Sequence, residues 1–464
     1  MRKIEIPYSE DSSLAYGHLA HLSGFIFLDS GYPNIKLGRF DILAAEPYLE
    51  ITTRGKLTDC KQDGKHWQTS DDPFQVLQRY LGEKVEYDPN LPFVGGALGY
   101  FSYDLGRTIE DLPATAKSDL TLPTLKFGLY DWAVVVDHKK QKSWLVGQGR
   151  DKKTFLQWDK RLEQLNQPKA ATITKPFKVN SNVSSNFSKE NYAKAFERIK
   201  HYIHEGDCYQ VNLAQRFVAD VAGDPWDAYL RLRTMNPAPF AAYMAVDSIE
   251  DNSYILSSSP ERFLLIKDNY VETKPIKGTR PRDEDPKRDQ ELAEELKNSQ
   301  KDQAENVMIV DLLRNDIGKN CAVGSVSVPK IFEIESYKTV HHLVSTVIGT
   351  LAENKHALDL IKGAFPGGSI TGAPKLRAME IIEELEPHRR SVYCGSIGYI
   401  SFDGQSDTNI AIRTMIWDQD KIHFQAGGGI VLDSEMEAEY QETYDKAAAM
   451  LNVLQSAQSD SRAD

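Results

Sequence analysis

Residues 274–282 read Lys-Pro-Ile-Lys-Gly-Thr-Arg-Pro-Arg, with Lys277 at the centre of the segment. The segment follows a predicted β-hairpin, which consists of an apolar run over 263–266, a turn at 268–269 and a returning strand over 270–273. The glycine after Lys277 lets the backbone approach a ligand closely, and a neutral lysine beside it could act as a nucleophile. Most lysines are solvated surface charges, so the pattern by itself predicts antiparallel β-structure and leaves the role of Lys277 open.

Strand-like and helix-like segments do not alternate regularly along the rest of the chain. Residues 1–165 read mainly as strands, whereas 166–187 are rich in Pro, Lys, Thr, Ser and Asn. Residues 188–455 combine long amphipathic helices with strands, and 456–464 form a polar end. This order favours an α+β fold with antiparallel sheets over a doubly wound parallel sheet. It also predicts an N-terminal lobe, a linker, a second domain and a flexible tail, divided at those residues.

The composition argues against several classes of protein. A formal charge of −12 and a pI near 5.5 leave no basic face for nucleic acid. Four cysteines lie far apart without a Cys-x-x-Cys pair, which indicates neither a zinc ribbon nor a disulfide framework. The first residues reach acid and proline before a signal peptide could form, and no apolar stretch approaches the ~18 residues that span a bilayer. We therefore expect a cytoplasmic protein without a membrane partner.

Several segments suit the binding of an anion. The glycine-rich run 367–372 leads into a predicted helix, and free backbone N–H groups at such a helix start attract a carboxylate. A second run at 427–429 would serve in the same way or form a bulge. Arg413 is predicted in an alternating strand, where it would either clamp a carboxylate or form a surface ion pair. Glu305 and Glu442 lie inside predicted helices, where most acids are simply solvated.

Four motifs occur in the same order as in a known family. They are Ser-Ser-Ser-Pro-Glu-Arg-Phe at 257–263, Pro-Ile-Lys-Gly-Thr at 275–279, Asp-Leu-Leu-Arg-Asn-Asp at 311–316 and Gly-Gly-Ser-Ile-Thr-Gly-Ala-Pro-Lys at 367–375. With them the chain resembles the chorismate-utilising enzymes, most strongly over 188–455. The resemblance implies a two-lobed α+β sandwich of large antiparallel β-sheets with outer helices. It also implies that residues 188–455 form the chorismate-binding catalytic domain and that the site lies between the lobes.

The resemblance implies roles for individual residues as well. Glu305 and Glu442 would be metal ligands for a magnesium ion that binds the substrate carboxylate. Such a role suits Mg²⁺, which takes carboxylate oxygens and keeps several waters. The implied substrate-binding positions are Gln210, Gly278, Thr279, His342, Ser369, Tyr393, Arg413, Gly427, Gly428, Gly429 and Lys446.

Lys277 and Gln210 indicate one branch of the family. Relatives that add nitrogen or water at C2 of chorismate usually carry alanine at position 277, and those that activate water carry lysine at position 210. This chain has the converse pair, which resembles the Mg-dependent transferases that aminate C4 and retain the enolpyruvyl group. Their product, 4-amino-4-deoxychorismate, serves 4-aminobenzoate and folate biosynthesis. In the implied mechanism Lys277 forms a covalent intermediate at C2, and Glu261 is the general acid.

Nitrogen would come from a partner. None of the four cysteines lies in a glycine-flanked elbow suited to hydrolyse glutamine. The resemblance therefore implies a separate glutamine amidotransferase subunit in a heterodimer. The alternatives are anthranilate synthase component I and, from another class, a non-catalytic tryptophan-binding regulatory subunit.

The N-terminal part matches the family more loosely. In relatives the corresponding segments contribute to a pocket that holds tryptophan, and simple packing of a strand against a loop is an equal alternative here. The residues at the positions of that tryptophan-binding pocket are Ser30, Arg39, Phe40, Asp41, Ile42, Pro239, Phe240 and Ala241.

Overall fold

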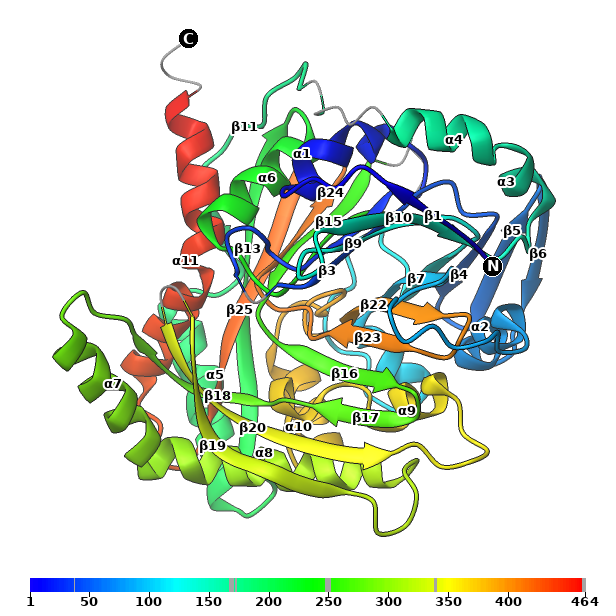
Figure 1. Cartoon of the computed structure of the whole chain (residues 1–464). Helices are drawn as coiled ribbons and strands as arrows, with labels where there is room; N and C mark the ends of the chain where they lie inside the picture. The colour runs from blue at the N-terminus through cyan, green and yellow to red at the C-terminus, as the bar shows by residue number, and fades with distance from the viewer. Residues whose placement is uncertain (37, 167–170, 172, 247–251, 338–339, 461–464) are drawn as a thin grey trace.

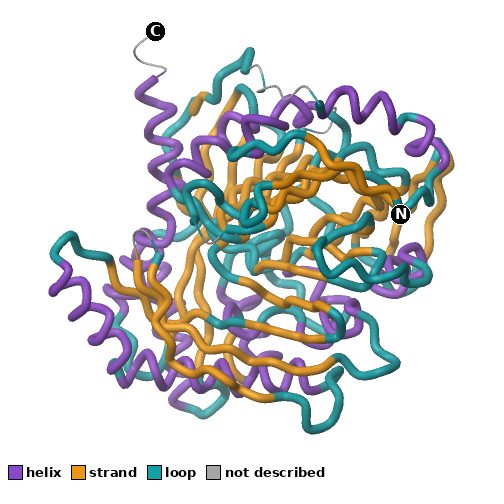
Figure 2. The backbone as a smooth tube through the Cα atoms, viewed as in Figure 1, coloured by secondary structure: helices purple, strands orange, loops and turns teal. Residues whose placement is uncertain are grey.

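The computed structural model describes residues 1–464 except 37, 167–170, 172, 247–251, 338–339 and 461–464. Within the described residues, the strands form two large sheets, one of 13 strands and one of 12. Neighbouring strands in both sheets are antiparallel. Strands occupy the middle of the molecule and most helices lie at its edges (Figures 1 and 2). The α+β architecture with antiparallel sheets is therefore confirmed.

The first sheet joins strands from distant parts of the chain. Its centre is formed by β2 beside β14, and β12 and β21 pair with β13 at one end. Its strands, in spatial order, are β1 (Arg2–Ile6), β10 (Lys142–Gly147), β9 (Ala133–Asp137), β3 (Phe40–Ala44), β2 (Ile26–Asp29), β14 (Phe240–Ala245), β15 (Ser253–Ser259), β24 (Thr414–Asp418), β25 (Lys421–Ile430), β13 (Gln210–Ala222) and β11 (Lys178–Val179), with β12 (Ser184–Ser185) and β21 (Gly372–Ala373) beside β13.

The second sheet is built in the same way. Here β22 and β7 are neighbours, and β19 pairs with β20. Its strands, in spatial order, are β18 (Ile276–Pro281), β20 (Val340–Thr350), β17 (Tyr270–Thr273), β16 (Arg262–Lys267), β23 (Ser406–Asn409), β22 (Ser396–Ser401), β7 (Gly96–Phe101), β8 (Leu125–Tyr130), β4 (Leu49–Arg54), β5 (Leu57–Gln62) and β6 (Lys65–Thr69), with β19 (Ser327–Ser336) beside β20.

Helices cover the sheets from outside. The last helix packs along β25, and α8 packs against β20. The helices are α1 (Ser12–Tyr16), α2 (Pro73–Leu81), α3 (Lys152–Leu156), α4 (Trp158–Leu165), α5 (Lys189–His204), α6 (Pro225–Met235), α7 (Pro286–Asn298), α8 (Gln300–Gly318), α9 (Ala357–Ala364), α10 (Lys375–Leu385) and α11 (Met436–Asp460), with 3₁₀ turns at η1 (Gly17–His21), η2 (Tyr103–Thr108) and η3 (Gly368–Ile370).

Local sequence signals set the helix ends. The Ser188 side chain accepts a hydrogen bond from the backbone N–H of Asn191 at 3.2 Å, which caps α5 at its start. Gly206, at φ +81°, follows the end of the same helix. Helix α11 continues to Asp460, and Ala457 is buried in its last turns. Residues 461–464 of the predicted tail and parts of the predicted linker lie outside the described residues.

A hydrophobic cluster fills the space between the two sheets. The first sheet contributes Ile26 and Ile255, and the second contributes Leu98 and Ile397, all almost fully buried. Because strands of both sheets bury apolar side chains in one layer, the sheets are held face to face. Polar residues described below occupy the same interface at other positions.

The prediction for Arg413 was wrong in one respect. The residue does not lie in a strand but in the connection between β23 and β24, with φ at +50°. Strand β23 belongs to the second sheet and β24 to the first, so the chain must break its extended conformation to cross between them. The crossing places Arg413 at the interface of the sheets.

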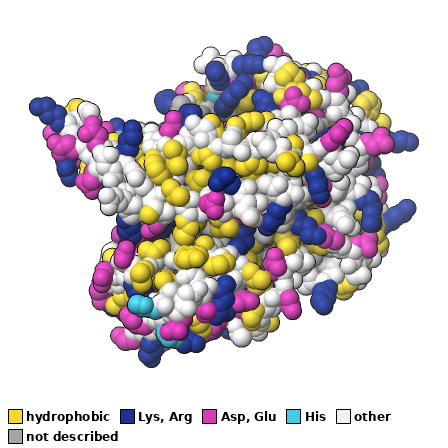
Figure 3. Space-filling model, turned by 90° about the horizontal axis from the view of Figure 1, so that it is seen from below, with side chains coloured by type: hydrophobic (Ala, Val, Ile, Leu, Met, Phe, Trp, Pro, Cys, Tyr) yellow, Lys and Arg dark blue, Asp and Glu magenta, His cyan; other side chains and the backbone are white. Residues whose placement is uncertain are grey.

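The surface is unevenly charged. Seen from below, charged side chains cover the projecting arm at the left, and hydrophobic ones gather across the middle of the face (Figure 3). The helices in the described parts of the chain are all too short or too polar for a bilayer crossing.

Candidate active site

Ser369 joins the predicted acid and the predicted nucleophile. Its hydroxyl donates a hydrogen bond to Glu261 Oε1 at 2.8 Å, and its carbonyl oxygen accepts one from Lys277 Nζ at 3.3 Å. Glu261 immediately precedes β16, Lys277 lies in β18, and Ser369 lies in η3. Three segments that are distant in sequence thus bring a carboxyl group and an amine to one serine.

Burial shifts both groups toward their neutral forms. It raises the pKa of Glu261, although Ser369 and Lys277 act in the opposite direction. Burial also lowers the pKa of Lys277, with help from Lys446 and against the attraction of Glu305. A carboxyl group that holds its proton and an amine that loses its proton are what general acid and nucleophilic catalysis require.

A β-bulge sets the direction of Lys277. The pairing of β18 with β20 shifts register between Lys277 and Thr279, and Gly278 between them has φ +75°. A Cβ atom at Gly278 would lie 2.7 Å from Leu296 Cδ1 and 2.8 Å from Asp302 Cγ. Glycine is therefore required by conformation and by space.

Thr279 in β18 and His342 in the neighbouring strand β20 form an uncharged pair. Thr279 Oγ1 and His342 Nδ1 are 2.9 Å apart. Burial, together with the positive charge of Arg413, lowers the pKa of His342 to about 4. The imidazole is thus uncharged at neutral pH and can exchange hydrogen bonds with a ligand.

Arg413 is half-buried and has no anionic partner in the described part of the chain. Its Nη1 donates only a long hydrogen bond, 3.4 Å, to Asn236 Oδ1. Burial lowers the pKa of its guanidinium, and no carboxylate offsets that effect. A half-buried guanidinium without a carboxylate partner is a favourable place for the carboxylate of a ligand.

Two carboxylates approach Lys277 from different helices. Glu305 comes from α8 and Glu442 from α11, and each interacts electrostatically with Lys277. Burial raises the pKa of Glu305. For Glu442 burial acts in the same direction, but Lys446 outweighs it and holds that pKa below its usual range. Lys446 Nζ lies 2.6 Å from Glu442 Oε1 and donates to the carbonyl oxygen of Gly427 at 2.9 Å.

A third acid, Glu439, was not predicted. A Cβ atom at Gly428 would lie 2.8 Å from Glu439 Oε2 and 3.2 Å from Glu442 Oε1, so the glycine makes room for both acids. Glu439 Oε1 accepts from Ser434 Oγ at 2.7 Å, while its buried Oε2 has no hydrogen-bond partner among the described residues. The sequence could have indicated Glu439, because it lies three residues before Glu442 and residues three apart share a helix face.

The oxygen-only donor set fits a hard divalent cation. Glu305 and Glu442 offer carboxylates, and Glu439 keeps one oxygen unpaired beside them. Among the described residues, no three such side chains converge closely enough to form a ready ligand cluster. Mg²⁺ takes carboxylate oxygens and usually keeps several of its waters.

Gln210 and the glycine run lie against each other. Gly427–Gly429 are regular members of β25 opposite β13, so they do not form the bulge considered above. A Cβ atom at Gly429 would lie 1.8 Å from Gln210 Nε2. The Gln210 side chain is 1 % exposed, and its Oε1 has no partner in the structure. Tyr393, the remaining predicted substrate residue, is buried near Arg390.

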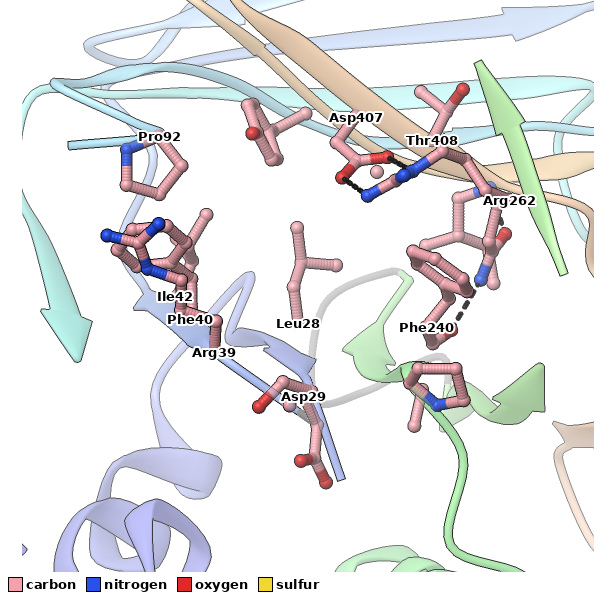
Figure 4. Close-up of a pocket in the computed structure, with 18 residues that line it drawn as sticks. Leu28, Asp29, Arg39, Phe40, Ile42, Pro92, Phe240, Arg262, Asp407 and Thr408 are labelled. Carbon is pink, nitrogen blue, oxygen red and sulfur yellow. Dashed lines mark hydrogen bonds and ion pairs between the residues drawn. The ribbon is translucent and has the colours of Figure 1, made fainter. Parts of the chain in front are cut away.

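The predicted tryptophan positions line a different cavity. This cavity, of about 230 Å³, lies between the sheets and is lined by seven of the eight predicted residues (Figure 4). Asp41 does not line it, because Ser30 and His138 bind its carboxylate behind the wall. Sequence reasoning missed further lining residues, which the topology brings from strands of the second sheet: Arg262, Tyr399, Asp407, Thr408 and Asn409.

Comparison with known proteins agrees with this geometry. A family model described as chorismate binding enzyme matches residues 24–452. Aminodeoxychorismate synthase component 1 of Escherichia coli strain K12 is 48% identical over 97% of this chain and 98% of its own length. Anthranilate synthase component 1 of Thermus thermophilus is 39% identical over 98% of both chains.

Solved structures share the fold. Anthranilate synthase component I from Streptococcus pneumoniae superposes with a TM-score of 0.77 at 34% identity, covering 89% of this chain and 92% of that one. The menaquinone-specific isochorismate synthase of Escherichia coli gives a TM-score of 0.73 at 20% identity, covering 98% of this chain and 94% of that one. The second likeness concerns the fold alone.

Proposed function

This chain belongs to the family of chorismate binding enzymes, and we propose that it aminates chorismate at C4 to give 4-amino-4-deoxychorismate. The higher identity to the aminodeoxychorismate synthase component than to the anthranilate synthase component supports this choice. The observation that carries it is the contact of Ser369 with both Lys277 and Glu261. The product would supply 4-aminobenzoate and folate biosynthesis.

Lys277 begins the reaction. Its neutral amine attacks C2 of chorismate, the ring double bonds shift, and the C4–O bond breaks. Glu261 gives its proton to the departing hydroxyl, which leaves as water, so that the enzyme holds a covalent adduct on Lys277. Ammonia then attacks C4, the double bonds shift back, and the bond between C2 and Lys277 breaks. Glu261, now a carboxylate, takes up the extra proton of the incoming nitrogen.

The substrate carboxylates require fixed positive charge. Arg413 supplies a half-buried guanidinium without an ion-pair partner in the described residues, and Lys446 supplies an ammonium group near Gly427. Thr279 and neutral His342 offer hydrogen bonds beside the ring. We assign Gly278, Ser369, Tyr393, Gln210 and the run Gly427–Gly429 to the walls of the same site.

Glu305 and Glu442 are the residues that would hold Mg²⁺. When bound, the ion would neutralise the substrate carboxylate and so favour attack by a nucleophile on the ring. The two glutamates come from α8 and α11, so their positions depend on how these helices pack. Glu439, whose Oε2 lies unpaired beside the space at Gly428, would accept a hydrogen bond from a water of that ion.

The nitrogen would reach the site from a glutamine amidotransferase partner in a heterodimer. The closely similar relatives are named as first components, which supports a second one. All four cysteines here are buried and unpaired, and burial raises the pKa of Cys208, Cys321 and Cys394, which makes them poor nucleophiles. Free thiols also support a cytoplasmic location. The isolated chain should therefore use ammonium salts but not glutamine, and glutamine-dependent turnover by the pure chain would exclude this partner.

The second cavity would hold tryptophan. Leu28, Ile42 and Phe240 offer an apolar wall for an indole. Tryptophan should raise the melting temperature of the protein, and Phe240→Ala should remove that effect. An unchanged melting temperature at millimolar tryptophan would show that the cavity is only a gap in the packing.

Product identification tests the main proposal. The protein is incubated with chorismate, Mg²⁺ and an ammonium salt at raised pH, and the product is analysed by mass spectrometry. We expect 4-amino-4-deoxychorismate with the enolpyruvyl group retained and no pyruvate released. Anthranilate together with pyruvate would identify the alternative enzyme, and no turnover with bound tryptophan would identify a regulatory subunit.

A further inference from the structure

A fully buried ion pair lies behind the serine that contacts Lys277 and Glu261. Arg390 is 1 % exposed and Glu386 is 4 % exposed. The guanidinium donates to the two Glu386 carboxylate oxygens at 3.0 and 2.6 Å. Although burial lowers the pKa of Arg390, Glu386 raises it well above its usual value. The guanidinium is therefore permanently charged.

The remaining donors of Arg390 bind two segments of the active site. Nη1 donates to the carbonyl oxygen of Ile370 at 2.9 Å, and Nη2 donates to the carbonyl oxygen of Asn212 at 3.1 Å. Ile370 directly follows Ser369 in η3, and Asn212 lies in β13 two residues after Gln210. Glu386 also accepts from the backbone N–H of Ala214 at 2.9 Å. One ion pair thus joins α10, η3 and β13.

Aromatic rings complete the surroundings of Arg390. Its guanidinium carbon lies 4.9 Å from the centroid of the Tyr103 ring and 5.7 Å from that of the Tyr393 ring. A lysine could not reproduce this arrangement, because an ammonium group is a point charge and lacks the planar fork of donors. Geometry, rather than charge alone, is required at this position.

We propose that Arg390 is a positioning residue that fixes the Ser369 turn against Glu261 and Lys277. The proposal rests on the function proposed above. Burying an ion pair is often no better for stability than apolar packing, so stability alone is a weak reason for such a pair here. Moving the turn by a fraction of an ångström would weaken the hydrogen bond at 2.8 Å from Ser369 to Glu261.

The test compares two ion pairs in the same protein. In the double variant Arg390→Gln/Glu386→Gln no uncompensated charge stays buried, and the amide at 386 can still accept from Ala214. The matched control is Arg216→Gln/Asp119→Asn, which removes another guanidinium–carboxylate pair, at 2.8 and 2.7 Å, that touches none of the proposed site residues. Thermal unfolding, kcat and KM for chorismate are measured for both, with ammonium as the nitrogen source.

We expect kcat to fall at least tenfold in the Arg390→Gln/Glu386→Gln variant and to stay within twofold of wild type in the control. The alkaline limb of its kcat profile should move to higher pH, because Glu261 loses the hydrogen bond that favours its charged form. Equal kcat values and unchanged pH profiles in the two variants would overturn the proposal and leave Arg390 a purely structural residue.

Arg390→Lys keeps the test decisive if the double variant does not fold. The lysine retains the charge opposite Glu386 but cannot serve all the acceptors, so a folded variant with lowered kcat is expected. Wild-type kcat in folded Arg390→Lys would refute the positioning role. Failure of the underlying function is recognised separately, because the wild-type protein would then give no 4-amino-4-deoxychorismate.

Discussion

Two acid–cation pairs lie on either side of the Ser369 turn, and they are built differently. Arg390 and Glu386 bind each other directly, and the guanidinium satisfies four acceptor contacts. Lys277 and Glu261 share no hydrogen bond and meet only through Ser369, with Lys277 donating at 3.3 Å. Burial disfavours the charged forms in both pairs, but only in the first do direct hydrogen bonds between acid and cation offset that cost. In the second pair burial raises the pKa of Glu261 and lowers that of Lys277, which shifts each group toward its neutral, reactive form.

Removing the amine would test this comparison most severely. Lys277→Ala should slow amination at C4 by about 10³-fold or more, because the nucleophile is lost. Wild type incubated with chorismate and Mg²⁺ without ammonia should form an adduct on Lys277 with the mass of chorismate minus water. Peptide mapping by mass spectrometry checks the position of the adduct.

Lys277→Arg is the matched control for the charge at this position. It should be as inactive as Lys277→Ala, since a guanidinium stays protonated and has no free electron pair. If Lys277→Ala formed the same product at the wild-type rate, Lys277 would not be the nucleophile and would contribute only its charge. The different surroundings of Lys277 and Arg390 would then reflect no difference in chemical role.

Replacing Glu261, the acid of the same pair, should have the next largest effect on kcat. Glu261→Gln should lower kcat by about 10²-fold, because the departing hydroxyl loses its proton donor. Since Glu261 acts in its protonated form, wild-type kcat should fall as pH rises through its raised pKa. The variant should lack that alkaline limb, which a pH series of initial rates would reveal. A limb that persists in the variant would assign it to another group.

Substitution of the two acids near Lys277, Glu305 and Glu442, should have a smaller effect on activity. Glu305→Gln or Glu442→Gln should raise the Mg²⁺ concentration for half-maximal activity by about tenfold or more, because one charged ligand is lost. Isothermal titration of Mg²⁺ into the protein gives a second readout. Glu437→Gln, on the same helix as Glu442 but paired with Lys189 at 2.6 Å, is the control that should change neither. Full activity of both variants at limiting Mg²⁺ would remove this assignment.

The smallest effect concerns the free energy of unfolding. Replacing the acid should change it in opposite directions in the two pairs, Glu261 with Lys277 and Glu386 with Arg390. Because the pKa of Glu261 is raised in the folded state, its contribution to stability is present below the unfolded pKa and is lost as pH rises through the folded one. Glu261→Gln should therefore increase the free energy of unfolding at pH 8 by on the order of 1 kcal/mol. Burial raises the pKa of Glu386 as well, but Glu386→Gln should decrease the free energy of unfolding, because the charge of Arg390 then stays buried without its partner and this cost outweighs the gain from removing the carboxylate. Denaturant unfolding at pH 5 and pH 8 checks both, and two changes of equal sign would contradict the comparison.

Local patterns predicted the parts of the fold that depend on neighbouring residues. The hairpin predicted before Lys277 is formed by β16 and β17. The crossing of the chain between the sheets at Arg413 was missed, because alternation of side chains carries no information on which sheet a strand joins. A motif-based resemblance indicated the catalytic pair, but only long-range pairing places both residues at Ser369.

The residues that support the site were harder to foresee. Arg390 lies in a polar stretch that reads as an ordinary turn after α10, and its acceptors are backbone carbonyls, which every residue has. In the sequence Glu439 resembles any other acid in a helix. Only the structure shows that its carboxylate lies in the space left by the missing side chain of Gly428. Such roles depend on three-dimensional neighbours, so composition and spacing cannot distinguish them from solvated side chains.

The neighbouring positions of β7 and β22 have a consequence for biosynthesis of the protein. Gly99 pairs with Gly398, and β2, close to the amino terminus, is completed by β14. The early strands therefore leave the ribosome long before their partners exist, and their edges stay open to other chains meanwhile. Contacts between such distant residues also make folding slow. We expect that the two halves of the chain, expressed separately, would aggregate unless they are produced together.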